Sequence, residues 1–302
     1  MSPLFVLILI GYAAVGRKLL SFEQTQGLAK LIVRIAMPML IFHVIATRQI
    51  SDVFQPAYFF GYTAASLAVF VLAWQVSRRR GVPPRLAVLN GFGSGTGNSG
   101  FIGYPLLLMV IGPSAGVYFA MNVLTENLLV FPLFFALQGL SSGEGERNIG
   151  RMVWQIGKNL LTNPMVLAIP AALIFAFGWL PLPAFMDKVS SMMAAATTPL
   201  ALFMIGANLY GIRIQSHHLK GMLAIALAKL LLCPLLVFGL MWLFGARGEV
   251  LFAGTLFGMM PMVSMYPLFG GLYGYGKETF DTMLLTTLLS VIPISLALLW
   301  WT

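Results

Sequence analysis

Long apolar runs, separated by short polar stretches, dominate this chain. Runs of about 18–25 residues have the length that a helix needs to cross roughly 30 Å of hydrocarbon. We count ten such runs, at residues 3–20, 28–47, 56–77, 86–112, 115–139, 162–180, 192–211, 219–244, 249–274 and 278–301. Residues 246–249 (ARGE) provide the turn between the eighth and ninth runs. The pattern therefore predicts an all-α membrane protein with ten transmembrane helices.

Composition supports lipid as the solvent of these runs. The 302 residues are 59% hydrophobic and only 9% charged, whereas soluble domains carry roughly 25% charged residues. The first run is expected to be a true span, because Arg17 and Lys18 follow it and a signal peptide has its basic residues first. The single cysteine, Cys233, can form no internal disulfide and fits no metal-ligand spacing. We expect no soluble domain.

The net charge of +9 does not indicate nucleic acid, because the basic residues lie between the apolar runs. Basic residues gather in cytoplasmic loops of membrane proteins. Three lie in loops on one side, namely Arg48, Lys188 and Arg247. Twelve lie on the other side, namely Arg17, Lys18, Arg78, Arg79, Arg80, Arg85, Arg147, Arg151, Lys158, Arg213, Lys220 and Lys277. This asymmetry predicts that both termini are non-cytoplasmic and that residues 141–161 form a cytoplasmic linker, with 149–161 as an amphipathic interfacial helix.

The two halves of the chain repeat each other. Prolines recur at a spacing of 161 residues in three pairs and of 162 in a fourth, namely Pro3/Pro164, Pro38/Pro199, Pro132/Pro293 and Pro105/Pro267. Leu124-Thr125 likewise matches Leu285-Thr286. The repeats would cover residues 1–140 and 162–302, with five spans each. An odd number of spans forces the second copy to insert upside down, which is an inverted repeat typical of alternating-access carriers.

Each repeat contains a glycine- and proline-rich interruption within an apolar run. The first reads GTGNSGFIGYPL (95–106), and the second reads GMMPMVSMYPL (258–268). A break in a membrane helix is tolerated only where it contacts protein or a wet cavity. Paired interruptions at matching places in two halves are the best sequence indication of a transporter's binding site.

Several motifs resemble the auxin efflux carrier family, which includes plant auxin exporters and bacterial malonate or malate permeases. They are LIVRIAMPMLIFHVIA (31–46), GNSGFIGYPL (97–106), TTPLALFMIGANL (197–209) and the Pro-x5-Pro stretch 261–267. The family is similar in fold to bile acid–sodium symporters. The resemblance implies a scaffold of spans 1, 2, 6 and 7, and a transport core of spans 3–5 and 8–10 with crossing broken spans four and nine. It also implies elevator-type motion, a homodimer and residence in the cytoplasmic membrane.

The candidate substrate-binding residues lie mostly in the two breaks. They are Asn98, Ser99, Gly100, Tyr104 and Pro105 in the first, Ser264, Met265, Tyr266 and Pro267 in the second, and Arg34 in span two. Proline suits the first turn of a helix, so Pro105 is expected to begin a new half-helix. The N-terminus of that half-helix would present unpaired N–H groups and partial positive charge to a carboxylate. The glycines around it have a simpler interpretation, which is close helix packing.

Ionisable residues within spans are functional candidates, because their burial in lipid is costly. Glu126, with Asn122 one turn earlier, could bind a proton or help to bind a sodium ion. His43 could titrate near neutral pH, although such a residue is more often structural. Lys229 could neutralise Glu126 or meet substrate, and we favour the charge pair. No cofactor or metal is expected, because His217-His218 has no further ligands nearby in sequence.

Together these patterns predict a secondary carrier for a small organic anion such as malonate, malate or an auxin-like acid, coupled to protons or sodium. The chain has no Gly-x-Ser-x-Gly elbow and no P-loop, which argues against an enzyme or an ATP-driven pump. A sodium-coupled bile-acid-like symporter is one alternative, weakened because span nine offers only Ser264 and Tyr266 as oxygen ligands. A channel, or a sensor that binds ligand without moving it, is the other.

Overall fold

The computed structural model describes residues 2–141, 149–210 and 219–301, and all the regular structure in these ranges is helical. Six helical segments are long and apolar enough to cross a membrane: Glu23–Ala46, Pro56–Arg79, Pro84–Ser141, Ala184–Asn208, Leu219–Leu243 and Gly276–Trp301. Shorter apolar helices cover Val6–Gly16, Pro164–Ala176 and Gly248–Gly258. The chain is therefore an all-helical membrane protein, as its sequence predicted. The division into ten spans with inverted repeats stays a prediction.

The chain forms two compact units, and the first comprises Met1–Gln55, Gly100–Val123 and Leu161–Arg213. Its helices are α1 (Ser2–Gly16), α2 (Phe22–Leu31), α3 (Met37–Ala46), α4 (Ile50–Val53), α7 (Tyr104–Ile111), most of α8 (Ala115–Thr125), α11 (Pro164–Ala176) and α12 (Ala184–Leu209). A capping box between Ser21 and Gln24 begins α2, which satisfies two otherwise unpaired backbone donors. Helix α1 packs along α12, and α3 packs against both α11 and α12.

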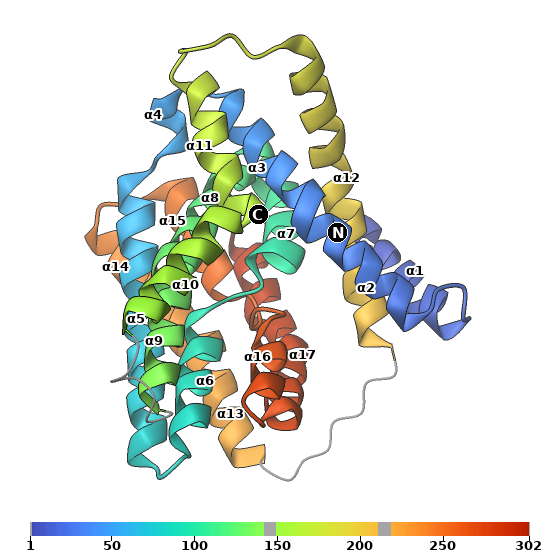
Figure 1. Cartoon of the computed structure of the whole chain (residues 1–302). Coiled ribbons are helices and arrows are strands. Elements are labelled where there is room, and N and C mark those ends of the chain that lie inside the picture. The colour runs from blue at the N-terminus through green and yellow to red at the C-terminus, as the bar shows by residue number, and fades with distance from the viewer. Residues whose placement is uncertain (1, 142–148, 211–218, 302) are drawn as a thin grey trace. The chain divides into compact units, whose positions relative to one another are not determined.

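The second unit comprises Pro56–Ser99, Leu124–Leu160 and Ile214–Thr302. Its helices are α5 (Pro56–Arg79), α6 (Pro84–Gly95), α9 (Phe131–Ser141), α10 (Ile149–Thr162), α13 (Leu219–Leu227), α14 (Cys233–Leu243), α15 (Gly248–Gly258), α16 (Tyr266–Leu272) and α17 (Gly276–Trp301). Helix α5 packs against α6 and α14, and α16 lies beside α17 (Figure 1). Aromatic side chains, among them Phe92, Phe134 and Phe269, form a buried cluster in this unit. The predicted interfacial segment is helical in α10, whose position in a membrane stays a prediction.

Short π-helical turns precede prolines at several places in the described residues. They are η1 (Ile32–Ala36) before Pro38, η2 (Ser99–Gly103) before Pro105, η4 (Glu126–Val130) before Pro132 and η5 (Ala228–Leu232) before Pro234. In η5, for example, the N–H of Cys233 bonds to the carbonyl of Ala228, five residues back. Proline lacks an N–H and its ring clashes with the carbonyl four residues earlier. The wider turn accommodates the ring without ending the helix.

Two glycines let the backbones of α5 and α6 touch. A Cβ atom on Gly95 would lie 2.7 Å from the carbonyl oxygen of Ser66, and one on Gly91 would lie 2.7 Å from that of Phe70. Real Cβ atoms essentially never come so close to a backbone oxygen. These two glycines of the first interruption therefore serve helix packing, which was the simpler interpretation of the glycine-rich sequence.

Candidate functional site

The first break lies at residues 96–98. Helix α6 ends at Gly95, Thr96 is extended (φ −114°, ψ 147°), and helical structure resumes in the π-turn that begins at Ser99. That turn leads into α7 without interruption, since Gly103 is in the αR region. Pro105 lies in the first turn of α7, as expected, but the helical structure after the break begins earlier, at Ser99. The wide turn accommodates the proline, and the unwound segment lies about two turns before it.

The second break spans residues 259–265, between the end of α15 at Gly258 and the start of α16 at Tyr266. Here the proline does lie in the first turn of the new helix, at Pro267. Ser264 and Met265 are exposed in the break. Tyr266 is instead buried, and its ring packs against Gly93, where a Cβ atom would come within 2.8 Å of the ring. The role of Tyr266 in this structure is thus packing of α16 against α6.

Asn98 joins the two breaks within the second unit. Its backbone N–H donates to the carbonyl oxygen of Pro261 over 2.7 Å. Its side-chain amide donates to the hydroxyl oxygen of Ser264 over 3.0 Å. Unwound backbone in a membrane helix must find partners outside its own helix, and the Asn98–Pro261 bond pairs one backbone group of each break. The side-chain bond adds a second link between the breaks. The structure therefore brings together the two interruptions that the sequence singled out separately.

Lys229 lies against the first break and is completely buried. Its Nζ donates to Cys233 Sγ over 3.4 Å, and a Cβ atom on Gly97 would lie 3.4 Å from the same Nζ. A thiol is a weak, neutral acceptor, whereas an ammonium has three donors. Among the described residues, no carboxylate forms an ion pair with Lys229 within 4.0 Å. Beside the unwound segment, Lys229 is thus a buried cation with spare hydrogen-bonding capacity.

Glu126 is a buried carboxylate of this unit and is 8% exposed; Asp281 on α17 is another, at 5%. It begins the π-turn η4 and accepts a hydrogen bond of 3.4 Å from the Ser99 hydroxyl. Ser99, itself buried, follows directly after the first break. The charge of Lys229 acts on Glu126 through space, without a direct ion pair between them among the described residues. Ser99 therefore connects the carboxylate to the break.

Three of the predicted site residues, Arg34, Asn122 and His43, lie in the first unit. Arg34 is exposed in η1, and Asn122 is buried in α8. His43 Nδ1 lies 3.2 Å from Ser190 Oγ and 3.3 Å from Asp187 Oδ1, both on α12. Such contacts fit a structural histidine, and its role in coupling stays a prediction. His217 and His218 lie outside the described residues.

Three further residues of the first unit follow the first break. An added Cβ atom on Gly100 would lie 2.8 Å from Met37 Cε, so this glycine allows close packing against the start of α3. Tyr104 is buried, and its ring centroid lies 5.6 Å from that of Phe119. Pro105 is also buried. These environments are packed rather than open, and the binding roles of the three residues stay predictions.

Sequence reasoning missed Cys233 and Gly97 as neighbours of the buried ammonium. From the sequence, Cys233 was excluded from a disulfide and from a metal site, and was given no other role. Its contact with Lys229 could have been predicted, because Cys233 follows Lys229 by four residues and residues at i and i+4 share a helix face. Gly97 was counted among packing glycines, and nothing in the sequence indicates that Lys229 lies against it.

Comparison with known proteins identifies the class to which this arrangement belongs. The family model described as "Membrane transport protein" matches residues 1–298. The "Putative malonate transporter" of Rhizobium meliloti (strain 1021) is 26% identical over 298 residues, which cover 97% of this chain and 92% of that protein. An "Uncharacterized transporter" of Methanothermobacter thermautotrophicus is 26% identical over 247 residues, covering 80% and 78% respectively. The chain therefore belongs to the membrane transport proteins of the auxin efflux carrier family.

Proposed function

We propose that this transporter is a secondary active carrier for a small carboxylate, and that Lys229 and the first break form its anion site. The observation that carries the proposal is the buried ammonium, which lies against the unwound segment and has a thiol as its hydrogen-bond partner. A buried charge is costly unless it is paired and hydrogen-bonded. A substrate carboxylate would provide the missing pairing, and would gain charge-assisted hydrogen bonds in return.

Asn98 and Ser264 would complete the site from the two breaks. Their side chains are hydrogen-bonded to each other across the breaks over 3.0 Å, and both carry groups that can donate to a carboxylate. Glu126 would be the coupling group, because it is linked to the break through Ser99 and its charge responds to protons or to a bound cation. Arg34, His43 and Asn122 remain candidates for gating and coupling in the first unit.

Malonate is the first substrate to test, because the name of one relative refers to malonate. Malate and auxin-like acids are further candidates from the family. We further propose that the carrier works by elevator-type alternating access, with two inverted five-helix repeats, both termini outside the cytoplasm, and a homodimeric assembly in the cytoplasmic membrane.

The proposal is tested by counterflow in proteoliposomes. Proteoliposomes that contain the protein are preloaded with unlabelled malonate, and uptake of radiolabelled malonate is measured in the presence of competing mono- and dicarboxylates. The assay is run at two pH values, with and without sodium. We expect saturable exchange that particular carboxylates inhibit. Non-saturable flux would indicate a channel. Binding without exchange would indicate a sensor. The absence of both binding and exchange, in protein shown to be folded, would refute an anion carrier.

A further inference from the structure

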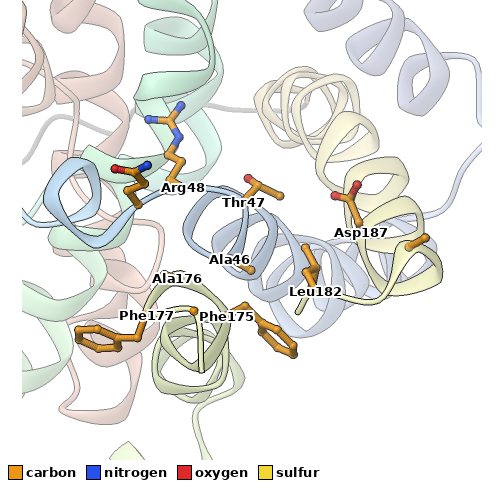
Figure 2. Close-up of a pocket in the computed structure, with 11 residues that line it drawn as sticks. Ala46, Thr47, Arg48, Phe175, Ala176, Phe177, Leu182 and Asp187 are labelled. Carbon is orange, nitrogen blue, oxygen red and sulfur yellow. The ribbon is translucent and has the colours of Figure 1, made fainter. Parts of the chain in front are cut away.

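The first unit contains a pocket of about 680 Å³, which is separate from the proposed transport site. It lies where α3 and α11 end and α12 begins (Figure 2). Its lining residues are Ala46, Thr47, Arg48, Gln49, Phe175, Ala176, Phe177, Gly178, Leu182, Ala184 and Asp187. The pocket thus combines backbone ends of three helices, two charged side chains and two aromatic rings.

A positively charged side chain, Arg48, and a negatively charged one, Asp187, lie at different places around this pocket. Figure 2 shows Arg48 and Asp187 with Thr47 drawn between them. Helices α3 and α11 end at Ala46 and Ala176, both in the lining, and helix C-terminal ends carry partial negative charge. Asp187 adds a full negative charge and is half exposed. The pocket therefore offers positive charge at Arg48 and, partially, at the start of α12 (Ala184), and negative charge at Asp187 and, partially, at the ends of α3 and α11.

Apolar rings continue from the pocket onto the surface. Phe177 stacks on Trp179 with ring centroids 5.1 Å apart. Trp179 is 70% exposed, and Leu180 and Phe185 are also exposed. Exposed aromatic residues at the ends of membrane helices are typical of the membrane–water interface. A ligand with a polar head in the pocket would therefore meet an apolar surface suited to acyl chains.

We propose that this pocket binds the headgroup of phosphatidylethanolamine from the surrounding bilayer. The phosphate would bind the guanidinium of Arg48, which can donate two parallel hydrogen bonds to phosphate oxygens. The primary ammonium would donate to Asp187 and to carbonyl oxygens at the two helix ends. The acyl chains would lie over Phe177, Trp179 and Leu180. One headgroup would thus satisfy both charges of the pocket.

Charge complementarity favours this lipid over other occupants. A phosphatidylglycerol headgroup has no cation for Asp187, and its net negative charge would face two helix C-terminal ends. A phosphatidylcholine headgroup has a quaternary ammonium that cannot donate hydrogen bonds. A dicarboxylate substrate would be repelled by Asp187 and could use only Arg48. The site is therefore expected to be independent of the transported anion.

The test is native mass spectrometry of the delipidated full-length protein, titrated with phosphatidylethanolamine, phosphatidylcholine and phosphatidylglycerol of identical acyl chains. We expect phosphatidylethanolamine to bind most tightly. Asp187→Asn and Arg48→Gln should each weaken it about tenfold, the size expected for loss of one charged hydrogen bond. Arg48→Lys should retain the preference. Lys188→Gln, an exposed charge beside Asp187 that does not line the pocket, should change nothing.

A further control separates headgroup recognition from a structural effect. His43→Gln removes the contact with Asp187 but leaves both pocket charges in place, so lipid preference should persist. Equal binding of the three lipids, or undiminished preference in folded Asp187→Asn protein, would overturn the proposal. Free phosphoethanolamine that binds as tightly as the lipid would also overturn it, because the pocket would then recognise a soluble zwitterion.

Discussion

Replacing Lys229 by methionine is the sharpest test of the anion site. Methionine preserves an unbranched side chain but removes the charge, and the hydrogen bond to Cys233 is lost with it. A hydrogen bond to a charged group contributes about 1.5–3 kcal/mol, and each 1.4 kcal/mol is about a tenfold change in affinity. We therefore expect the apparent KM for malonate in Lys229→Met to rise by about 10- to 150-fold.

The fold should survive this change. The hydrogen-bond partner of the ammonium is a neutral thiol, and the side chain is completely buried. A buried charge without an ion-pair partner is costly, so its replacement by an apolar side chain of similar length should not destabilise the fold. The thermal midpoint of the purified variant in detergent should thus equal or exceed that of the wild type. Counterflow kinetics and thermal unfolding on the same preparations separate the two effects.

Lys220→Met is the matched control, because Lys220 is exposed near the start of the helix α13. It should leave both KM and the thermal midpoint unchanged. A Lys229→Met protein with wild-type KM but lower stability would refute our reasoning, because it would show that Lys229 serves only the fold. A loss of maximal rate in proportion to the folded fraction would lead to the same conclusion.

The other predictions concern the breaks and the helix contact beside them. Asn98→Ala keeps the backbone bond to Pro261 but loses the side-chain bond, so KM in counterflow should rise about three- to tenfold; an unchanged KM would remove Asn98 from the site. Glu126→Gln should abolish the pH or sodium dependence of exchange, and an unaltered dependence would exclude coupling there. Gly95→Ala should lower stability by about 1–3 kcal/mol, because the added methyl group would overlap the backbone of α5. Gly239→Ala is the control, since Gly239 has open space around it. Equal thermal midpoints for the two variants would contradict the packing argument.

The sequence located both interruptions, because glycine and proline mark positions where a membrane helix cannot continue normally. The first break, at residues 96–98, lies within the predicted stretch 95–106, but helical structure resumes at Ser99, before Pro105. A π-turn explains this, because its wider hydrogen bonding accommodates a proline within a continuing helix. No local pattern distinguishes Pro105, which follows a π-turn, from Pro267, which starts α16 after irregular chain.

Tertiary contacts were beyond the sequence for a different reason. Asn98 and Ser264 are 166 positions apart, and their contact depends on how two helices cross rather than on local propensity. The sequence suggested that Lys229 neutralises Glu126, and this charge pair stays a prediction. It could not indicate the hydrogen bonds that the two groups make, from Ser99 to Glu126 and from Lys229 to Cys233. Hydropathy predicts which residues are buried, not which neighbours they meet.

The main-chain bond between Asn98 and Pro261 makes the geometry of the two breaks independent of their side chains. Breaking it in a water-poor interior would cost several kcal/mol, so both interruptions must travel as one body in any movement. Relatives could then exchange the side chains around the breaks, and with them their preferred solute, without rebuilding the cradle. If the proposed anion site is correct, substrate choice and the backbone geometry of the two breaks would be separable, and this segment would be a natural starting point for engineering carriers with altered selectivity.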